Sequence, residues 1–60
     1  MKTYQERLDE FVDYLCQLPD NQVLGVIDKE QNAVNASPND GFRCWCLKLA
    51  KTEGQRRGLI

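Results

Sequence analysis

The Cys-Trp-Cys run at residues 44–46 is the feature that most suggests metal or redox chemistry. Cys44 and Cys46 flank Trp45, Cys16 lies far from both in sequence, and the chain contains no histidine. A structural zinc site takes four Cys or His ligands, usually in pairs with two to four residues between them. A redox dithiol has two residues between its cysteines, at a helix N-terminus. Neither pattern is present, so we predict no metal, no cofactor and no catalytic thiol.

Clustered carboxylates are the second feature that suggests chemistry. Glu6, Asp9, Glu10 and Asp13 recur at the spacing of one helical face. Acid–base catalysis needs two carboxyl groups in contrasting environments, whereas this face would be uniformly exposed to water. A chain of 60 residues also has little room for the supporting residues that an active site requires. We therefore predict that the protein is not an enzyme.

Charge is unevenly distributed along the chain, and this indicates a binding surface. Acidic residues outnumber basic ones in residues 1–30 and the reverse holds in residues 31–60, although the net charge is only −1. Such asymmetry favours contact with a partner, or self-association between complementary faces. The residues that we expect to contact a partner are Glu6, Asp9, Glu10, Asp13, Arg43, Leu47, Lys48 and Lys51.

The first of the elements that must position these side chains is an amphipathic helix over residues 4–18. Its apolar face comprises Tyr4, Leu8, Phe11, Leu15 and Leu18, which are spaced by three or four residues. Thr3 and Glu6 have the spacing of a capping box. Pro19 ends the helix, because a residue that precedes proline is disfavoured in the helical region.

Residues 22–28 and 33–36 are predicted as the two strands of a short hairpin. The first run contains three β-branched residues and an internal glycine, Gly25, and this composition is typical of a strand. Residues 29–32 would form the loop. The rival interpretation is a helix over residues 21–34, with Val23, Ile27 and Val34 on one face.

Residues 37–54 match a helix better than a strand. Ser37 as the N-cap, Pro38 at the first helical position and Asp40 give the start of a helix, and Gly54 suits its C-terminal cap. The apolar face would comprise Phe42, Trp45, Cys46, Leu49 and Ala50. On such a helix, positions two apart diverge by roughly 200°, so the two thiols of the Cys-Trp-Cys run cannot share an ion. A strand over residues 42–49 would place both thiols on one face and reopen the metal question.

The core is predicted to form between the two helical faces, with Trp45 packed on the apolar face of residues 4–18. Leu47, Val12 and Tyr14 would lie at the edges of these faces. We therefore expect a small single-domain α+β fold over residues 1–54, helix–β-hairpin–helix in order, with a flexible C-terminal tail over residues 55–60. The alternatives are a three-helix bundle and a helix with a three-stranded antiparallel sheet.

These features predict a small cytosolic protein–protein interaction module that regulates or inhibits a partner protein and forms a homodimer. Met1 leads into a charged segment rather than an apolar signal region, and no apolar run approaches the ~18 residues of a membrane span. Tiny soluble proteins of this kind are often regulators or inhibitors, including ones made by phages and mobile elements, an association that rests on size and character rather than on any motif. The alternative is a nucleic-acid-binding accessory factor that uses the basic C-terminal helix and tail, which the acidic pI of about 5.2 disfavours.

Overall fold

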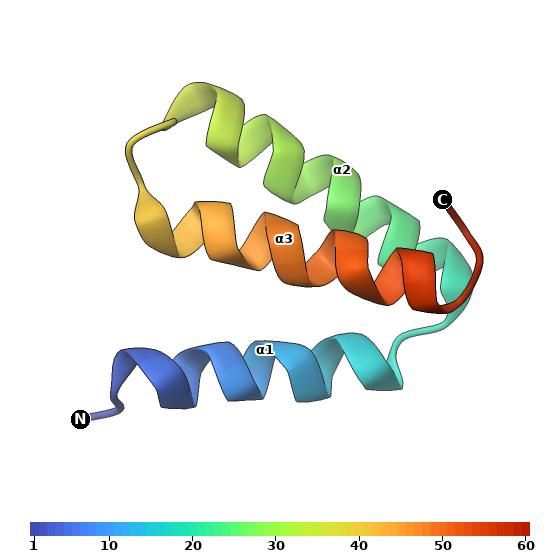
Figure 1. Cartoon of the computed structure of the whole chain (residues 1–60), viewed down its shortest axis with the longest axis horizontal. Helices are drawn as coiled ribbons and strands as arrows, with labels where there is room; N and C mark the ends of the chain where they lie inside the picture. The colour runs from blue at the N-terminus through green and yellow to red at the C-terminus, as the bar shows by residue number, and fades with distance from the viewer.

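The chain folds into three helices without a β-strand, as a computed structural model of residues 1–60 shows (Figure 1). The helices are α1 (Tyr4–Gln17), α2 (Asp20–Ala36) and α3 (Gly41–Arg56). The predicted helix–hairpin–helix α+β fold is therefore wrong, because the segment expected to form the hairpin is helical throughout. The alternative of a three-helix bundle describes the molecule.

The hairpin prediction failed because the β-preference of residues 22–28 is weaker than the gain from burying one helical face. In α2, Val23 is fully buried and Glu30 is nearly so, while Val26 and Ile27 are half-buried. These side chains share the face of α2 that packs on α3. An isolated two-stranded hairpin has no such face to cover and is marginal in water. Tertiary packing therefore decided the secondary structure of this segment.

The predicted helix at the N-terminal end is observed as α1. The Thr3 hydroxyl accepts a hydrogen bond from the Glu6 N–H at 3.1 Å, which satisfies one of the free N–H groups of the first turn. Leu18 then adopts extended backbone, with φ −79° and ψ 143°, as expected of a residue that precedes a proline.

The predicted helix over residues 37–54 is also observed, as α3, but both of its ends differ from the prediction. Asp40 rather than Ser37 is the N-cap, and its carboxylate accepts from the Arg43 N–H at 3.2 Å. Gly54 is not the C-terminal cap, because α3 continues to Arg56. Arg57 is the C-cap, and Gly58 follows it with φ +75°, where a residue without a side chain is favoured.

The three helices form a thin layer in which α3 lies between α1 and α2 (Figure 1). The layer measures 31 × 25 × 14 Å. Helices α1 and α3 run in the same direction. Helix α2, which comes between them in the sequence, runs in the opposite direction. Because α3 has a neighbour on each side, it supplies half of the buried apolar side chains. The full set is Leu8, Leu15, Val23, Cys46, Leu47 and Ala50.

Gly54 sets how closely α2 and the end of the chain approach α3. A Cβ atom at this position would lie 2.9 Å from Ile27 Cδ1 and 3.3 Å from Ile60 Cγ1, both shorter than ordinary carbon–carbon contacts. The residue is buried inside α3. A glycine in a helix interior costs stability, and here the missing side chain leaves the space that Ile27 and Ile60 occupy.

The Arg57 side chain connects all three helices, and we call this set of hydrogen bonds the Arg57 clasp. The guanidinium donates to the backbone carbonyls of Leu15, Cys16 and Leu18 at 3.0, 3.3 and 2.6 Å, to the Asp20 carboxylate at 3.0 Å and to the Glu53 carboxylate at 2.6 Å. The carbonyls at the C-terminal end of a helix lack partners within the helix, and a cation there also matches the helix dipole. The clasp therefore caps α1 from the end of α3.

Residues 55–60, which we predicted as a flexible C-terminal tail, include the end of α3 and the largely buried Arg57 side chain. Gln55 and Arg56 form the last turn of α3, and the Leu59 N–H donates to the Gly54 carbonyl at 2.8 Å. The Arg57 side chain is only 13% exposed. The predicted flexibility of these residues stays a prediction, but the Arg57 side chain takes part in the packing of the domain.

Candidate functional site

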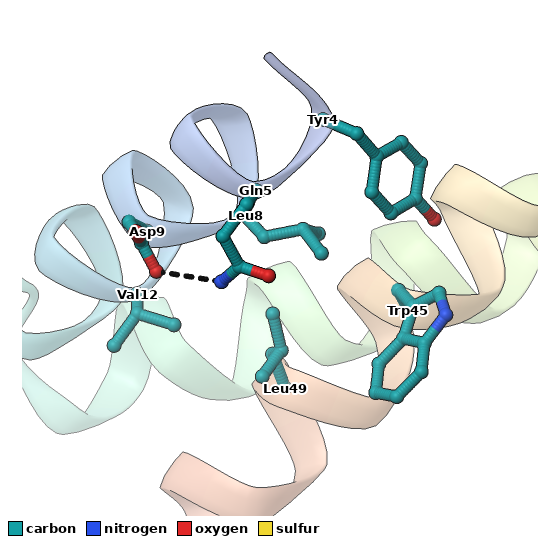
Figure 2. A pocket seen from close by; sticks show the side chains of 7 residues that line it. All are labelled: Tyr4, Gln5, Leu8, Asp9, Val12, Trp45 and Leu49. Carbon is teal, nitrogen blue, oxygen red and sulfur yellow. Dashed lines mark hydrogen bonds between the residues drawn. The ribbon is translucent and has the colours of Figure 1, made fainter.

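The surface of the molecule is hollowed between α1 and α3, and this groove is the candidate binding site (Figure 2). Its volume is about 290 Å³. The residues that line it are Tyr4, Gln5, Leu8, Asp9 and Val12 from α1, and Trp45 and Leu49 from α3. Five of these seven residues are apolar or aromatic, so the groove suits an apolar ligand surface.

Trp45 forms one wall of the groove and is 46% exposed. We expected it in the core, and that prediction is wrong. The inward-facing arc of α3 is filled by Cys46, Leu47 and Ala50, and Trp45 lies beyond the edge of this arc. The ammonium group of Lys48 lies 4.8 Å from the centre of the Trp45 ring, a cation–π contact that covers part of it.

The opposite wall is held in place by an aromatic contact. The Tyr4 ring meets the Phe42 ring edge-to-face, with 5.5 Å between the ring centres, a geometry that aromatic pairs prefer. Tyr4 thus contacts α3 and still exposes half of its surface to solvent. Leu8 lies beneath it as a buried part of the groove floor.

The polar groups of the groove are few and lie at its rims. On the α1 side, the Gln5 amide donates to the Asp9 carboxylate at 3.0 Å (Figure 2). On the α3 side, the Lys48 ammonium group lies over the Trp45 ring. The groove therefore has an acidic rim on α1 and a basic rim on α3, with apolar side chains between them.

The other acidic candidates lie away from the groove. Glu6, Glu10 and Asp13 are exposed on α1, and Glu10 forms an ion pair with Lys2. Exposed ion pairs of this kind contribute little to stability. Of the four predicted acidic residues, only Asp9 is brought to the candidate site.

The basic candidates are divided between ion pairs and free positions. Arg43 pairs with Glu30 at 3.3 Å, while Lys48 and Lys51 are exposed on α3. Leu47, which we expected at an edge of the helix, lies in the core instead. The reason is that α2 covers that side of α3.

Only Asp9 of the seven lining residues was among the predicted contact residues; the other six are Tyr4, Gln5, Leu8, Val12, Trp45 and Leu49. Tyr4 and Trp45 were assigned to the core by their helical spacing, and Val12 was placed at the edge of a face. The signal that could have found them is the width of the two apolar faces. Val12 and Trp45 extend those faces further around each helix than one neighbour can cover.

A partly buried ion pair lies on the other side of α3, against α2. The Glu30 side chain is only 5% exposed and accepts hydrogen bonds from Arg43 Nη1 at 3.3 and 3.5 Å. Burial, followed by the nearby Glu30 carboxylate, raises the pKa of the Cys46 thiol. The thiolate form of Cys46 is thus disfavoured, and the thiolate is the reactive form of cysteine.

We expect thiol reagents to label the three cysteines in two classes. Cys16 and Cys44 are exposed and Cys46 is buried, so two thiols should react quickly at neutral pH and the third only as the protein unfolds. Counting the equivalents of a chromogenic disulfide reagent consumed with time, with and without denaturant, measures this. Three equally fast equivalents in the folded protein would show that Cys46 is accessible.

The structure shows no group of three or more His, Cys, Asp or Glu side chains placed to hold a metal ion. None of the three helices combines the length and the apolar character needed to cross a bilayer. No protein-family model, no curated protein and no solved structure matches this chain. The geometry of the groove is therefore the basis for a functional proposal.

Proposed function

We propose that this chain is a protein–protein interaction module that binds its partner in the groove between α1 and α3. The observation that carries the proposal is the half-exposed Trp45 at the wall of an apolar groove. Tryptophan is the residue type most enriched among the side chains that dominate binding energy at interfaces. By occupying a surface of its partner, such a module acts as a regulator or inhibitor.

The groove fits a polypeptide better than a small molecule. Its volume of about 290 Å³ is at the lower limit of sites for small ligands, which also present several convergent polar groups. Here the polar lining groups, Gln5 and Asp9, bond to each other. The partner that fits is an amphipathic helix whose apolar stripe enters the groove. Basic residues on that helix would face Asp9 and acidic residues would face Lys48.

The competing nucleic-acid function is less well supported by the arrangement of charges. Three of the five cations in residues 31–60 are paired with carboxylates: Arg43 with Glu30, and both Arg56 and Arg57 with Glu53. A phosphate backbone would have to compete with these contacts, and its binding depends on cations that are free to neutralise it. We place the module in the cytoplasm, because its three unpaired thiols suit a reducing compartment.

A photo-crosslinking residue at Val12, inside the groove, tests the proposal in the native host cell. The control site is Leu24, which is exposed on α2. We expect an adduct with one protein from position 12 and none from position 24. That protein is then identified by mass spectrometry, purified and titrated against the chain.

The titration uses two aromatic truncations that differ in position. Trp45→Ala removes the groove wall, and Tyr14→Ala removes a ring of similar exposure, 52% against 46%, outside the groove. We expect Trp45→Ala to weaken binding by about 30-fold or more and Tyr14→Ala by less than about threefold. Equal effects of the two substitutions, or adducts at position 24 in place of position 12, would contradict the proposal.

A further inference from the structure

We propose that, when no other protein is bound, a second copy of this chain occupies the groove between α1 and α3. The two copies are related by a two-fold axis parallel to α1 and α3, so that Trp45 of each copy enters the groove of the other. This inference rests on the proposed function, because it takes the groove to be a surface that binds protein.

The first support is the position of opposite charges across the groove. Asp9 lies on the α1 rim, and Lys48 lies on the α3 rim beside Trp45. Both charges stand at nearly the same level along the helices, because the helices run in the same direction and Tyr4 meets Phe42 near their starts. Asp9 follows Tyr4 by five residues and Lys48 follows Phe42 by six. The groove is thus acidic on one side and basic on the other at a single level.

The second support is that α1 and α3 run in the same direction (Figure 1). A 180° rotation about an axis parallel to the two helices exchanges the positions of α1 and α3. It leaves the position of each residue along the helix axis unchanged. It therefore places α1 of one copy on α3 of the other, with Asp9 facing Lys48 of the second copy. In a two-fold interface each such contact occurs twice. A half-turn about the perpendicular axis in the same plane would instead place α1 on α1, with Asp9 against Asp9.

The third support is the amount of surface available. Only nine of the 60 residues are buried in the single chain, since a single layer of three helices leaves both of its faces open to solvent. The layer measures 31 by 25 Å in its plane, and a stable interface buries roughly 800 Å² on each partner. A face-to-face contact would cover Tyr4, Val12 and Trp45, which are otherwise exposed.

This arrangement gives the module a simple form of regulation. The dimer closes the groove, so another protein must displace the second copy before it can bind. The fraction of chains with a free groove then falls as the concentration of the chain rises, by mass action.

Sedimentation equilibrium across a dilution series from millimolar to micromolar tests the dimer. We expect a mass of twice the 6.9 kDa of one chain at the upper end. Asp9→Lys and Lys48→Asp should each weaken association by about tenfold or more, because each creates two like-charge contacts. The double exchange restores both contacts and should recover association to within about threefold of the original. Asp13→Lys, the same change of charge outside the groove on α1, is the matched control.

Two results would overturn the inference: a monomer at millimolar concentration, or a dimer that neither single exchange weakens. Circular dichroism of each variant shows whether the helices are retained, and the double exchange tests the contact even if one single variant folds poorly. The proposed function is judged separately. A monomeric chain that still crosslinks to another protein from position 12 refutes the dimer and leaves the binding groove intact, whereas an intact dimer with no other partner refutes the regulator.

Discussion

Replacing Arg57 with alanine is expected to lower the midpoint of thermal unfolding by about 10 °C or more, the largest effect of any single truncation of a charged side chain in this protein. The substitution removes hydrogen bonds to three carbonyls near the end of α1 and to the carboxylates of Asp20 and Glu53. Carbonyls left without a partner at a partly buried helix end are costly. Circular dichroism at increasing temperature measures the change.

Arg57→Lys is the matched control, because it keeps the positive charge and removes the planar fork of donors. We expect it to recover only a minor part of the lost stability, since one ammonium group cannot reach the Leu15, Cys16 and Leu18 carbonyls together. If lysine restored the full midpoint, charge alone would explain the role of residue 57. An unchanged midpoint in the alanine variant would show that the clasp is not formed in solution.

The pH dependence of stability provides a second test of the contacts that Arg56 and Arg57 make with Glu53. Hydrogen bonds from Arg56 and then Arg57 lower the pKa of the Glu53 carboxyl to about 2. Because this pKa is lower in the folded state than the ordinary value of roughly 4.3 in the unfolded chain, the contribution of Glu53 is fully present above that value. It is lost as the pH falls toward 2. Urea unfolding between neutral pH and pH 2 should show this loss, and Glu53→Gln should reduce it.

Replacing Gly54 with valine is expected to destabilise the domain by about 1–3 kcal/mol, and by more if α2 must move. A Cβ atom alone would come within 2.9 Å of Ile27 Cδ1, and the two methyl groups of valine extend further into the same space. Small domains have a stability of only about 3–5 kcal/mol, so this change should unfold a measurable fraction of the protein. Urea denaturation gives the free energy of unfolding.

Gly25→Ala is the matched control, because nothing lies within 4 Å of a Cβ atom at that position in α2. There alanine should raise the free energy of unfolding by about 0.5–1 kcal/mol, the difference in helix propensity between the two residues. If the free energy of unfolding falls for Gly54→Val and rises for Gly25→Ala, packing decides the effect at Gly54 and helix propensity decides the effect at Gly25. If valine at position 54 were tolerated without loss, the approach of α2 to α3 would be wider than the structure has it.

The two glycines also show where sequence reasoning reached its limit. Gly25 was interpreted as part of a strand, where a glycine often marks a bulge, and Gly54 as the end of a helix, where glycine is common. Neither interpretation holds: both residues lie inside helices. The reason for Gly54 is the close approach of Ile27, a residue 27 positions away in sequence, and no local pattern carries that information.

The candidate site was predicted only in part. Asp9 and Lys48 were expected to contact a partner and lie at the two rims of the groove. Trp45 was assigned to the core, because its spacing from Phe42 and Leu49 matched one helical face. That spacing defines a stripe on the helix, but which part of the stripe is covered depends on where the neighbouring helices lie.

The sequence by itself determined α1 and α3, because periodic apolar residues and the cap at Thr3 act over a few residues of the chain. Only the tertiary structure decided that α2 is a helix, that the Arg57 clasp caps α1, and that Trp45 lies at the surface. The physical reason is common to all three. α3 is packed between two helices, so its inward arc is filled from both sides, and the contacts that decide these features join residues far apart in the chain.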